Sequence, residues 1–314
     1  MKIHSAQSST DKRKPRNPYA LARVVRHYPE THPWVATYEK VGQWLASFIE
    51  RLPVAVPHVL EIGSGGGELA RTIVDRLNAR RRAFHMRLVE PSALMRRSHS
   101  QEIVAQDSHV LVCPHPFPGA HKGYSNETYD AVISILSFHH LRNWSAELCR
   151  LVRDCNRQQV FISGIETGDA VFVGSGRGCC VDPKARAFWH EYRSALQQFR
   201  MRVNRRPGPL APWNDKPLHD VLREQGFRSL AHRTWTVVHR LTYGEVLQWI
   251  ADGALTSLLA FGRATDRYAL AKHMKAWMSA KGLKTSDPWA YTAGVRFTVF
   301  LRGVDHGAAR KWHN

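Results

Sequence analysis

Short apolar runs alternate with longer amphipathic stretches through the middle of the chain. The apolar runs at 58–62, 86–89, 109–113, 129–136 and 159–165 predict strands. The stretches between them repeat their apolar residues at helical spacing, which is typical of helices with one buried face. Because strands that alternate with helices form parallel sheets covered on both faces, residues 55–167 are predicted to be the first five steps of a doubly wound α/β fold.

The flanking sequence has longer helical patterns and two further strand patterns. A helix is predicted at 34–50, before the first strand. The later part predicts helices at 187–203, 218–226, 242–261 and 267–283, and strands at 228–241 and 294–303. Aromatic residues recur at helical spacing in these later helices, and we expect them to pack in a core or to build a lid.

The composition is that of an ordinary globular protein. Hydrophobic residues make up 43% and charged residues 23% of the 314 residues, which excludes wholesale disorder and fibrous architectures. No apolar stretch is long enough to span a membrane, and the N-terminus lacks the apolar core of a secretory signal. Five cysteines at scattered positions do not form a disulfide framework, so we expect a cytoplasmic, reduced protein.

The charge of the chain is strongly positive. There are 45 Lys and Arg residues against 26 Asp and Glu residues, a formal net charge of +19. Such a balance favours anionic partners, either a polyanion such as RNA or acidic small molecules. The excess is spread along the chain, which is weaker evidence for nucleic-acid binding than a single basic run. Residues 1–33 are predicted to be a basic mobile tail.

The candidate chemistry begins where the first predicted strand meets the following helix. Residues 61–68 read EIGSGGGE, and glycine at such a junction allows a tight turn and a close approach of the backbone to a ligand. A dinucleotide fingerprint is disfavoured because Glu68 stands where the third glycine of GxGxxG belongs. Instead Glu61 precedes the glycines, and Glu90 ends the next strand, where its carboxylate can accept hydrogen bonds from ribose hydroxyls.

The segments LEIGSGGGELA, LVEPSALM and YDAVISILSFHHL together resemble the class I S-adenosylmethionine-dependent methyltransferases, and in particular their UbiE/type-11 small-molecule branch. The resemblance covers residues 34–303. It implies a Rossmann-like, doubly wound, mostly parallel seven-stranded sheet with a helical lid. It also implies S-adenosylmethionine as the cofactor and S-adenosylhomocysteine as its product. The implied methyltransferase domain spans 34–314, with a lid or substrate region at 168–220 and 241–292.

The resemblance also implies the cofactor contacts. The residues expected around the methionine and sulfonium part are Glu61, Gly63, Ser64, Gly65 and Gly67. Glu90 is expected to bind the ribose, Pro91 and Ser92 to flank the adenine, and Ser134, Leu136 and Ser137 to form the floor of the pocket. The family often has an acidic residue after the third strand, where this chain has Cys113-Pro114-His115-Pro116. We therefore expect a backbone carbonyl, Asp107 or Ser108 to hold the adenine.

Candidates for the acceptor chemistry follow the later strands. His139 and His140 come after the fourth strand, where an imidazole can remove a proton at neutral pH or simply pack locally. Glu166, Arg177 and His190 are candidates for binding the acceptor, with solvated loop and helix positions as the alternative. We expect no metal ion at this site.

These residues predict in-line methyl transfer to a small molecule that has an apolar, aromatic or anionic part, such as a specialised metabolite. The motifs of amino-methylating nucleic-acid enzymes, cytosine-C5 enzymes and protein-arginine enzymes do not occur at the matching positions. An RNA methyltransferase, favoured by the net charge, is the first alternative. A protein that binds S-adenosylmethionine without turnover is the second.

Overall fold

The computed structural model describes residues 22–26, 37–103, 109–114, 128–135, 137, 143–154, 156–166, 183–199, 216–254 and 263–302. The helices are α1 (Ala22–Arg26), α3 (Tyr38–Glu50), α4 (Glu68–Ala79), α5 (Ala93–Glu102), α7 (Trp144–Asp154), α9 (Pro183–Gln198), α10 (Lys216–Glu224), α11 (Tyr243–Asp252) and α13 (Ala264–Ala280). The strands are β1 (His58–Ile62), β2 (His85–Val89), β3 (Val110–Cys113), β4 (Tyr129–Ile135), β5 (Asn156–Glu166), β6 (Phe227–Thr242) and β7 (Pro288–Arg302).

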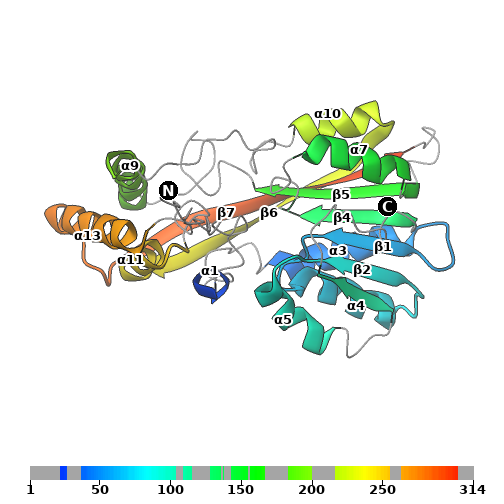
Figure 1. The fold of residues 1–314 in the computed structure, drawn as a ribbon, viewed down its shortest axis with the longest axis horizontal. Helices are drawn as coiled ribbons and strands as arrows, with labels where there is room; N and C mark the ends of the chain where they lie inside the picture. Colours follow the sequence, from blue (N-terminus) through cyan, green and yellow to red (C-terminus); the bar gives the residue numbers. More distant parts are fainter. Residues whose placement is uncertain are drawn as a thin grey trace, which may run out of the picture.

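The described strands form one sheet in the order β3-β2-β1-β4-β5-β7-β6 (Figure 1). The first five strands run parallel, and β7 is antiparallel to both of its neighbours, β5 and β6. The order reverses between β1 and β4, and the carboxyl ends of the strands at such a reversal are where ligands of open α/β sheets bind. The Rossmann-like, doubly wound α/β fold predicted from the sequence is confirmed.

Helices cover both faces of the parallel strands. On one face, Val59 of β1 and Ile133 of β4 belong to a core that includes α3 and α4. On the other face, Leu60 and Val132 belong to a core that includes α7 and α10. All four side chains are fully buried. These strands therefore appear in the sequence as unbroken apolar runs, and their carboxyl ends are left to carry the site.

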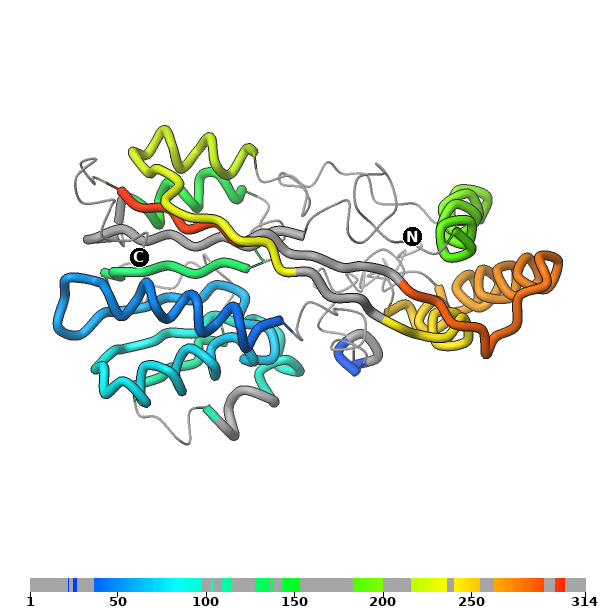
Figure 2. Tube along the Cα trace, turned by 180° about the vertical axis from the view of Figure 1, so that it is seen from behind, coloured from blue at the N-terminus to red at the C-terminus, as the bar shows by residue number. Residues whose placement is uncertain are grey.

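Strands β6 and β7 are much longer than the parallel strands and continue past the end of β5. Glu166, the last residue of β5, pairs with Val295, which pairs on its other side with Trp235. Seven further pairs, from Thr236–Gly294 to Thr242–Pro288, continue as two strands alone. At the usual rise of a strand, this two-stranded part, called the ribbon (residues 236–242 and 288–294), is roughly 24 Å long. Figure 2 shows the far end of the ribbon beside a separate group of helices.

That group is the helical module, which consists of α9, α11 and α13 at the far end of the ribbon (Figure 1). Trp189 of α9 packs against Trp289 of β7, with ring centroids 5.8 Å apart. Phe188 packs against Tyr243 of α11, with ring centroids 5.4 Å apart. All four side chains are buried, so these aromatic residues form the core of the module.

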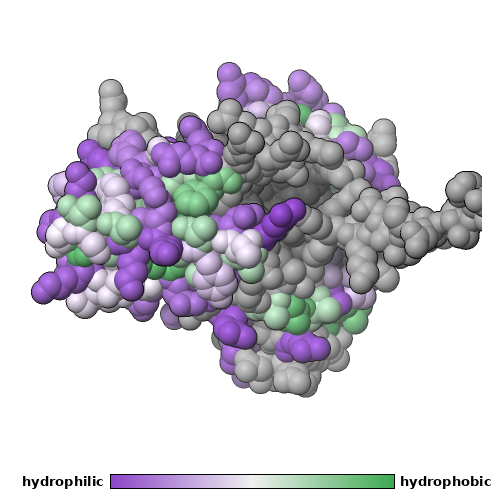
Figure 3. Space-filling view, turned by 60° about the vertical axis from the view of Figure 1, so that its left-hand side comes forward, coloured by the Kyte–Doolittle hydropathy of each residue, from purple (hydrophilic) through white to green (hydrophobic). Residues whose placement is uncertain are grey.

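The outer surface of the module is polar. Lys184, Arg186 and Arg193 of α9 are exposed, and Figure 3, which turns this end of the molecule forward, shows mostly hydrophilic surface with smaller hydrophobic areas. A hydrogen bond of 2.6 Å between His273 Nε2 and Glu191 Oε1 joins α13 to α9.

Trp44 of α3 supports the base of the ribbon. Its ring lies 5.3 Å from that of Trp235, which in turn lies 5.3 Å from the ring of Phe297. The guanidinium of Arg233 lies over the Trp44 ring at 5.7 Å. Aromatic and cation–π contacts of this kind stabilise a fixed orientation, so the ribbon starts from a defined point on the sheet.

Among the element boundaries that differ from those predicted, two differ most. The helix predicted at 242–261 is α11, which ends at Asp252 because Gly253 takes a left-handed φ of 72°. It starts from a capping box, in which Thr242 Oγ1 accepts the N–H of Glu245 and the Glu245 carboxylate accepts the N–H of Thr242. The last strand begins at Pro288 rather than at 294.

The short helix α1 lies within the segment predicted as a basic tail, most of which falls outside the described residues. In the ranges that the structure describes, no helix is long and apolar enough to cross a membrane.

Candidate active site

The turn between β1 and α4 depends on three glycines with left-handed backbone. Gly63, Gly65 and Gly67 have φ angles of 74°, 58° and 88°, a region that other residues enter at a cost. The N–H of Gly63 donates to the carbonyl of Val89 at 2.7 Å, which continues the pairing of β1 with β2. The N–H of Gly67 donates to the carbonyl of Ser64 at 3.0 Å and closes the turn. This glycine loop (residues 63–67) therefore lies where the parallel strands have their carboxyl ends, an edge of the sheet that is called the carboxyl edge. It lies beside the reversal of strand order between β1 and β4.

Gly63 also lacks room for a side chain. A Cβ at this position would overlap the side chain of Ser137, which follows β4. The hydroxyl of Ser137 donates to the carbonyl of Ile62 at 2.6 Å and lies 2.6 Å from the hydroxyl of Ser134. The two serines thereby hold the end of β4 against the glycine loop.

Glu90 follows β2 and reaches the glycine loop from the side. Its Oε2 accepts the N–H of Gly65 at 3.1 Å, and its Oε1 accepts the N–H of Ser92 at 2.8 Å. Burial raises the pKa of Glu90, and these two N–H groups and the charge of Arg96 oppose that rise. Since an ionised carboxylate has about four lone-pair sites, the side chain retains acceptor capacity for a ligand's hydroxyl groups.

Glu61, near the end of β1, is a buried acid without a hydrogen-bond donor at one oxygen. The residue is 2% exposed, and within the described part of the chain no donor reaches its Oε2. Burial, and then the charges of Glu68 and Glu90, raise the pKa of Glu61 from 4.5 to about 8. A buried carboxylate of this kind is stabilised by an adjacent positive charge.

Glu68 is a third acid at the same loop. It is the first residue of α4, and its carboxylate folds back so far that a Cβ on Gly66 would overlap it. Burial raises the pKa of Glu68 as well. Glu61, Glu68 and Glu90 are called the carboxylate cluster.

A family model described as a methyltransferase domain matches residues 37–232 of the chain, well over half of its length. The chain belongs to this methyltransferase family. The resemblance to class I S-adenosylmethionine-dependent methyltransferases is confirmed by this match and by the fold. Comparison of the methyltransferase with curated proteins gave no match.

Two solved structures show similarity to the methyltransferase at low sequence identity. One is a candidate type II methyltransferase from Anaeromyxobacter dehalogenans, with 14% identity, a TM-score of 0.50, and coverage of 85% of this chain and 97% of that chain. Another is a candidate methyltransferase from Bacillus halodurans C-125, with 10% identity, a TM-score of 0.49, and coverage of 83% and 98%.

The glycine loop of the methyltransferase fits S-adenosylmethionine, the cofactor of the family. This cofactor carries a sulfonium and an ammonium group, and the Oε2 of Glu61 is an acceptor without a donor among the described residues. Gly63, Gly65 and Gly67 carry no Cβ, so a ligand can approach the backbone at these positions. The remaining acceptor sites of Glu90 suit the hydroxyls of a ribose.

The structure brings many of the predicted cofactor residues to one loop: Glu61, Gly63, Ser64, Gly65, Gly67, Glu90, Ser92 and Ser137, with Pro91 exposed beside them. Other candidates lie outside the described residues: Asp107, Ser108, Leu136, His139, His140 and Arg177. Glu166 is the last residue of β5, at the carboxyl edge, and His190 is exposed on α9. The roles of all these residues remain predictions.

Sequence reasoning did not assign Glu68 to the site. It used this residue only to reject a dinucleotide fingerprint. Its position could have indicated a role, because Glu68 is the first helical residue after the glycines and its side chain is long enough to reach back to the loop.

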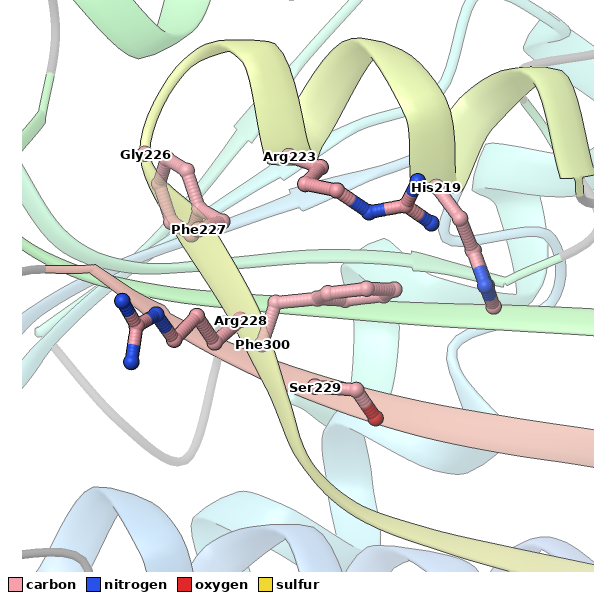
Figure 4. Close-up of a pocket in the computed structure, with 7 residues that line it drawn as sticks. All are labelled: His219, Arg223, Gly226, Phe227, Arg228, Ser229 and Phe300. Atoms are coloured by element: carbon pink, nitrogen blue, oxygen red, sulfur yellow. The ribbon is translucent and has the colours of Figure 1, made fainter. Parts of the chain in front are cut away.

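A cavity of about 520 Å³ lies at the edge of the sheet opposite to the glycine loop. His219 and Arg223 of α10, the start of β6 and Phe300 of β7 line it (Figure 4). Strand β6 begins beside the end of β7, and the end of β7 pairs with the early part of β5. The cavity therefore lies at the edge of the sheet where the parallel strands begin, which is called the amino edge. Arg223 is largely exposed and forms an ion pair with Asp220 at 3.3 Å. The cavity is therefore separate from the glycine loop and its cofactor.

Proposed function

We propose that this methyltransferase transfers the methyl group of S-adenosylmethionine to a small molecule by in-line displacement. The ribbon is the observation that supports this proposal most strongly. It holds the helical module beyond the carboxyl edge, the same edge at which the glycine loop lies. A module in that position suits an acceptor that is enclosed and separated from water before transfer.

The bound cofactor supplies a methyl group on a positive sulfur, which is already reactive toward a nucleophile. The protein then contributes alignment of the acceptor and removal of its proton. We assign proton removal to His140, with His139 as the neighbouring candidate, because both follow β4 at the edge where ligands of parallel sheets bind. Glu166 is assigned to acceptor binding because it ends β5 at that same edge.

The described face of α9 supports an acceptor with an anionic group. Arg186, His190 and Arg193 are all exposed, and their spacing of four and three residues places them on one side of the helix. Together with Arg177 in the preceding segment, they offer cationic groups that suit a carboxylate or a phosphate.

The test is transfer of labelled methyl from S-adenosylmethionine into an extract of host cells, divided by a small-pore filter and by nuclease treatment. We expect the label in small, nuclease-resistant material. The Glu90→Gln variant should give much less label, since it weakens the cofactor site, whereas Glu39→Gln should match the wild type because Glu39 is exposed on α3.

Other outcomes distinguish the alternatives. Label in large, nuclease-sensitive material contradicts the small-molecule proposal and indicates an RNA methyltransferase, which the net charge of +19 favours. Binding of S-adenosylmethionine without label in any fraction of several different extracts indicates a protein that binds the cofactor without turnover.

The assignment of His140 has its own test once an acceptor is known. His140→Ala should lower kcat while leaving the affinity for S-adenosylmethionine within about twofold, because general-base catalysis contributes roughly 10²–10⁴-fold to rate. An unchanged kcat in His140→Ala, together with a loss in His139→Ala, moves the role to His139.

A further inference from the structure

The three acids of the carboxylate cluster surround one short loop. Glu90 lies against Gly65 through a hydrogen bond of 3.1 Å, and Glu68 folds over Gly66. Glu61 lies beneath them, 2% exposed, with no donor at its Oε2 in the described chain. No salt bridge in the described ranges joins any of the three to a Lys or Arg side chain.

The polar side chains around Glu61 belong to several elements that meet at the loop. Glu68 belongs to α4, Glu90 follows β2, and Ser134 and Ser137 on the β4 side are neutral. The charge of Arg96 of α5 acts on Glu90, but its Nη1 donates to backbone carbonyls, to that of Glu90 at 2.6 Å and to that of Pro114 at 3.4 Å. The three acidic side chains of the cluster are therefore not balanced by positive side chains among the described residues around them.

Three carboxylates this close cannot all ionise easily in a buried site, so the free loop retains a proton. A ligand with a positive charge reverses that balance, because it stabilises every ionised carboxylate that it approaches. S-adenosylmethionine brings a sulfonium and an ammonium to this loop.

We propose that binding of S-adenosylmethionine releases a proton from the carboxylate cluster, and that Glu68 determines how much of a proton is released. Glu61 is the group that gives up the proton, because it is the most buried of the three and its Oε2 lacks a donor among the described residues. Glu68 acts through Glu61. The negative charge of its carboxylate makes ionisation of Glu61 less favourable, so Glu61 keeps its proton in the free loop. The proposal requires the cofactor but not any particular acceptor.

The pKa of Glu61, about 8, gives the expected size of the effect. At pH 7.5 about three-quarters of the free protein carries this proton, and at pH 9 about a tenth does. Binding that ionises Glu61 therefore releases about 0.75 proton at pH 7.5 and about 0.1 at pH 9. Below pH 8 the affinity should rise as the pH rises, by up to tenfold per pH unit.

Removing the charge of Glu68 should reduce this release without abolishing it. Burial is the largest cause of the raised pKa of Glu61, and the charge of Glu68 is the next. Glu68→Gln should therefore lower the pKa of Glu61 and release a smaller fraction of a proton at pH 7.5 than wild type.

The experiment is isothermal titration calorimetry of the full chain with S-adenosylmethionine in buffers of different ionisation enthalpy, at pH 7.5 and pH 9. The slope of the observed enthalpy against the buffer's ionisation enthalpy counts the protons. Wild type, Glu68→Gln and Glu68→Asp are compared with Glu39→Gln, which makes the same charge change in the exposed first turn of α3. We expect reduced release in Glu68→Gln, and near wild-type release in Glu68→Asp and Glu39→Gln.

Each contrary result has a distinct meaning. Binding by wild type with no dependence on the buffer overturns the proposal and leaves the cofactor assignment intact. Equal proton counts in wild type and Glu68→Gln overturn the role of Glu68. Absence of any binding by folded wild type overturns the cofactor site itself and the proposal with it. None of these outcomes depends on methyl transfer, so they are separate from a failure of the proposed small-molecule function.

Discussion

Replacement of Glu61 by Gln should make the cofactor-free protein more stable at alkaline pH. The pKa of Glu61 rises from 4.5 to about 8 in the folded protein, mainly through burial. Between these values the unfolded chain has lost the proton and the folded protein still holds it. Stability therefore falls as the pH rises through this window, by about 1.4 kcal/mol per pH unit from this group.

Glu61→Gln removes that dependence because the amide does not titrate. Between pH 5 and pH 8 the variant should gain about 4 kcal/mol of unfolding free energy relative to wild type, to within a factor of about two. It should also bind S-adenosylmethionine more weakly, since it lacks the negative charge that the cofactor's cations require. A gain in stability that accompanies a loss of binding identifies a residue retained for function.

The assay is urea unfolding of both proteins without cofactor at pH 5, 6, 7 and 8. The difference in unfolding free energy between variant and wild type should increase steadily across the series. Glu39→Gln provides the control, because its exposed carboxyl should give no such increase. Parallel curves of stability against pH for wild type and Glu61→Gln would refute the assignment of a buried, proton-retaining acid.

Three further predictions concern the loop and the module. Gly63→Ala should destabilise the protein by about 2–4 kcal/mol in urea unfolding, because it combines a positive φ with overlap on Ser137; a change below about 0.5 kcal/mol contradicts the loop geometry. Glu90→Gln should weaken S-adenosylmethionine binding by about tenfold or more in calorimetry, because it replaces the charged acceptor that holds the N–H groups of Gly65 and Ser92 and that suits ribose hydroxyls; unchanged affinity removes Glu90 from the site. Thr242→Ala should cost about 1 kcal/mol in thermal unfolding through loss of the capping box, and Thr242→Ser should restore it.

The parallel half of the fold was predictable because both of its faces are buried. Strands such as Tyr129–Ile135 are buried at every position, so the sequence shows them as continuous apolar runs. Helix ends were predictable where a glycine takes a left-handed conformation, as Gly226 does after α10. Gly253 ends α11 in the same way, but apolar residues follow it in the sequence, so the pattern predicted a longer helix.

The ribbon was only partly predictable. Residues 288–293 of β7 were not predicted to be part of the strand. They belong to the ribbon, where they form a strand because they pair with β6 and not because they lie beside a parallel strand. Tertiary context of this kind leaves a weak local signal. The glycine loop and Glu90 were predictable from their order and spacing. The inward fold of the Glu68 side chain was not, because a side-chain direction at the start of a helix depends on the neighbours that surround it.

Strand β7 lies between β5 and β6 although it follows every other strand in the chain. In the described sheet, β6 pairs with β7 alone, so residues 227–242 remain an unpaired edge during synthesis until residues 288–302 emerge. The 45 residues that contain α11 and α13 lie between these two strands and must be accommodated in the same step. Assembly thus ends with one late event. In this event β6 joins the sheet, and α11 and α13 take their places beyond the carboxyl edge. A chain interrupted before β7 would contain the glycine loop and the whole carboxylate cluster, yet lack the connection that holds these helices beyond the carboxyl edge.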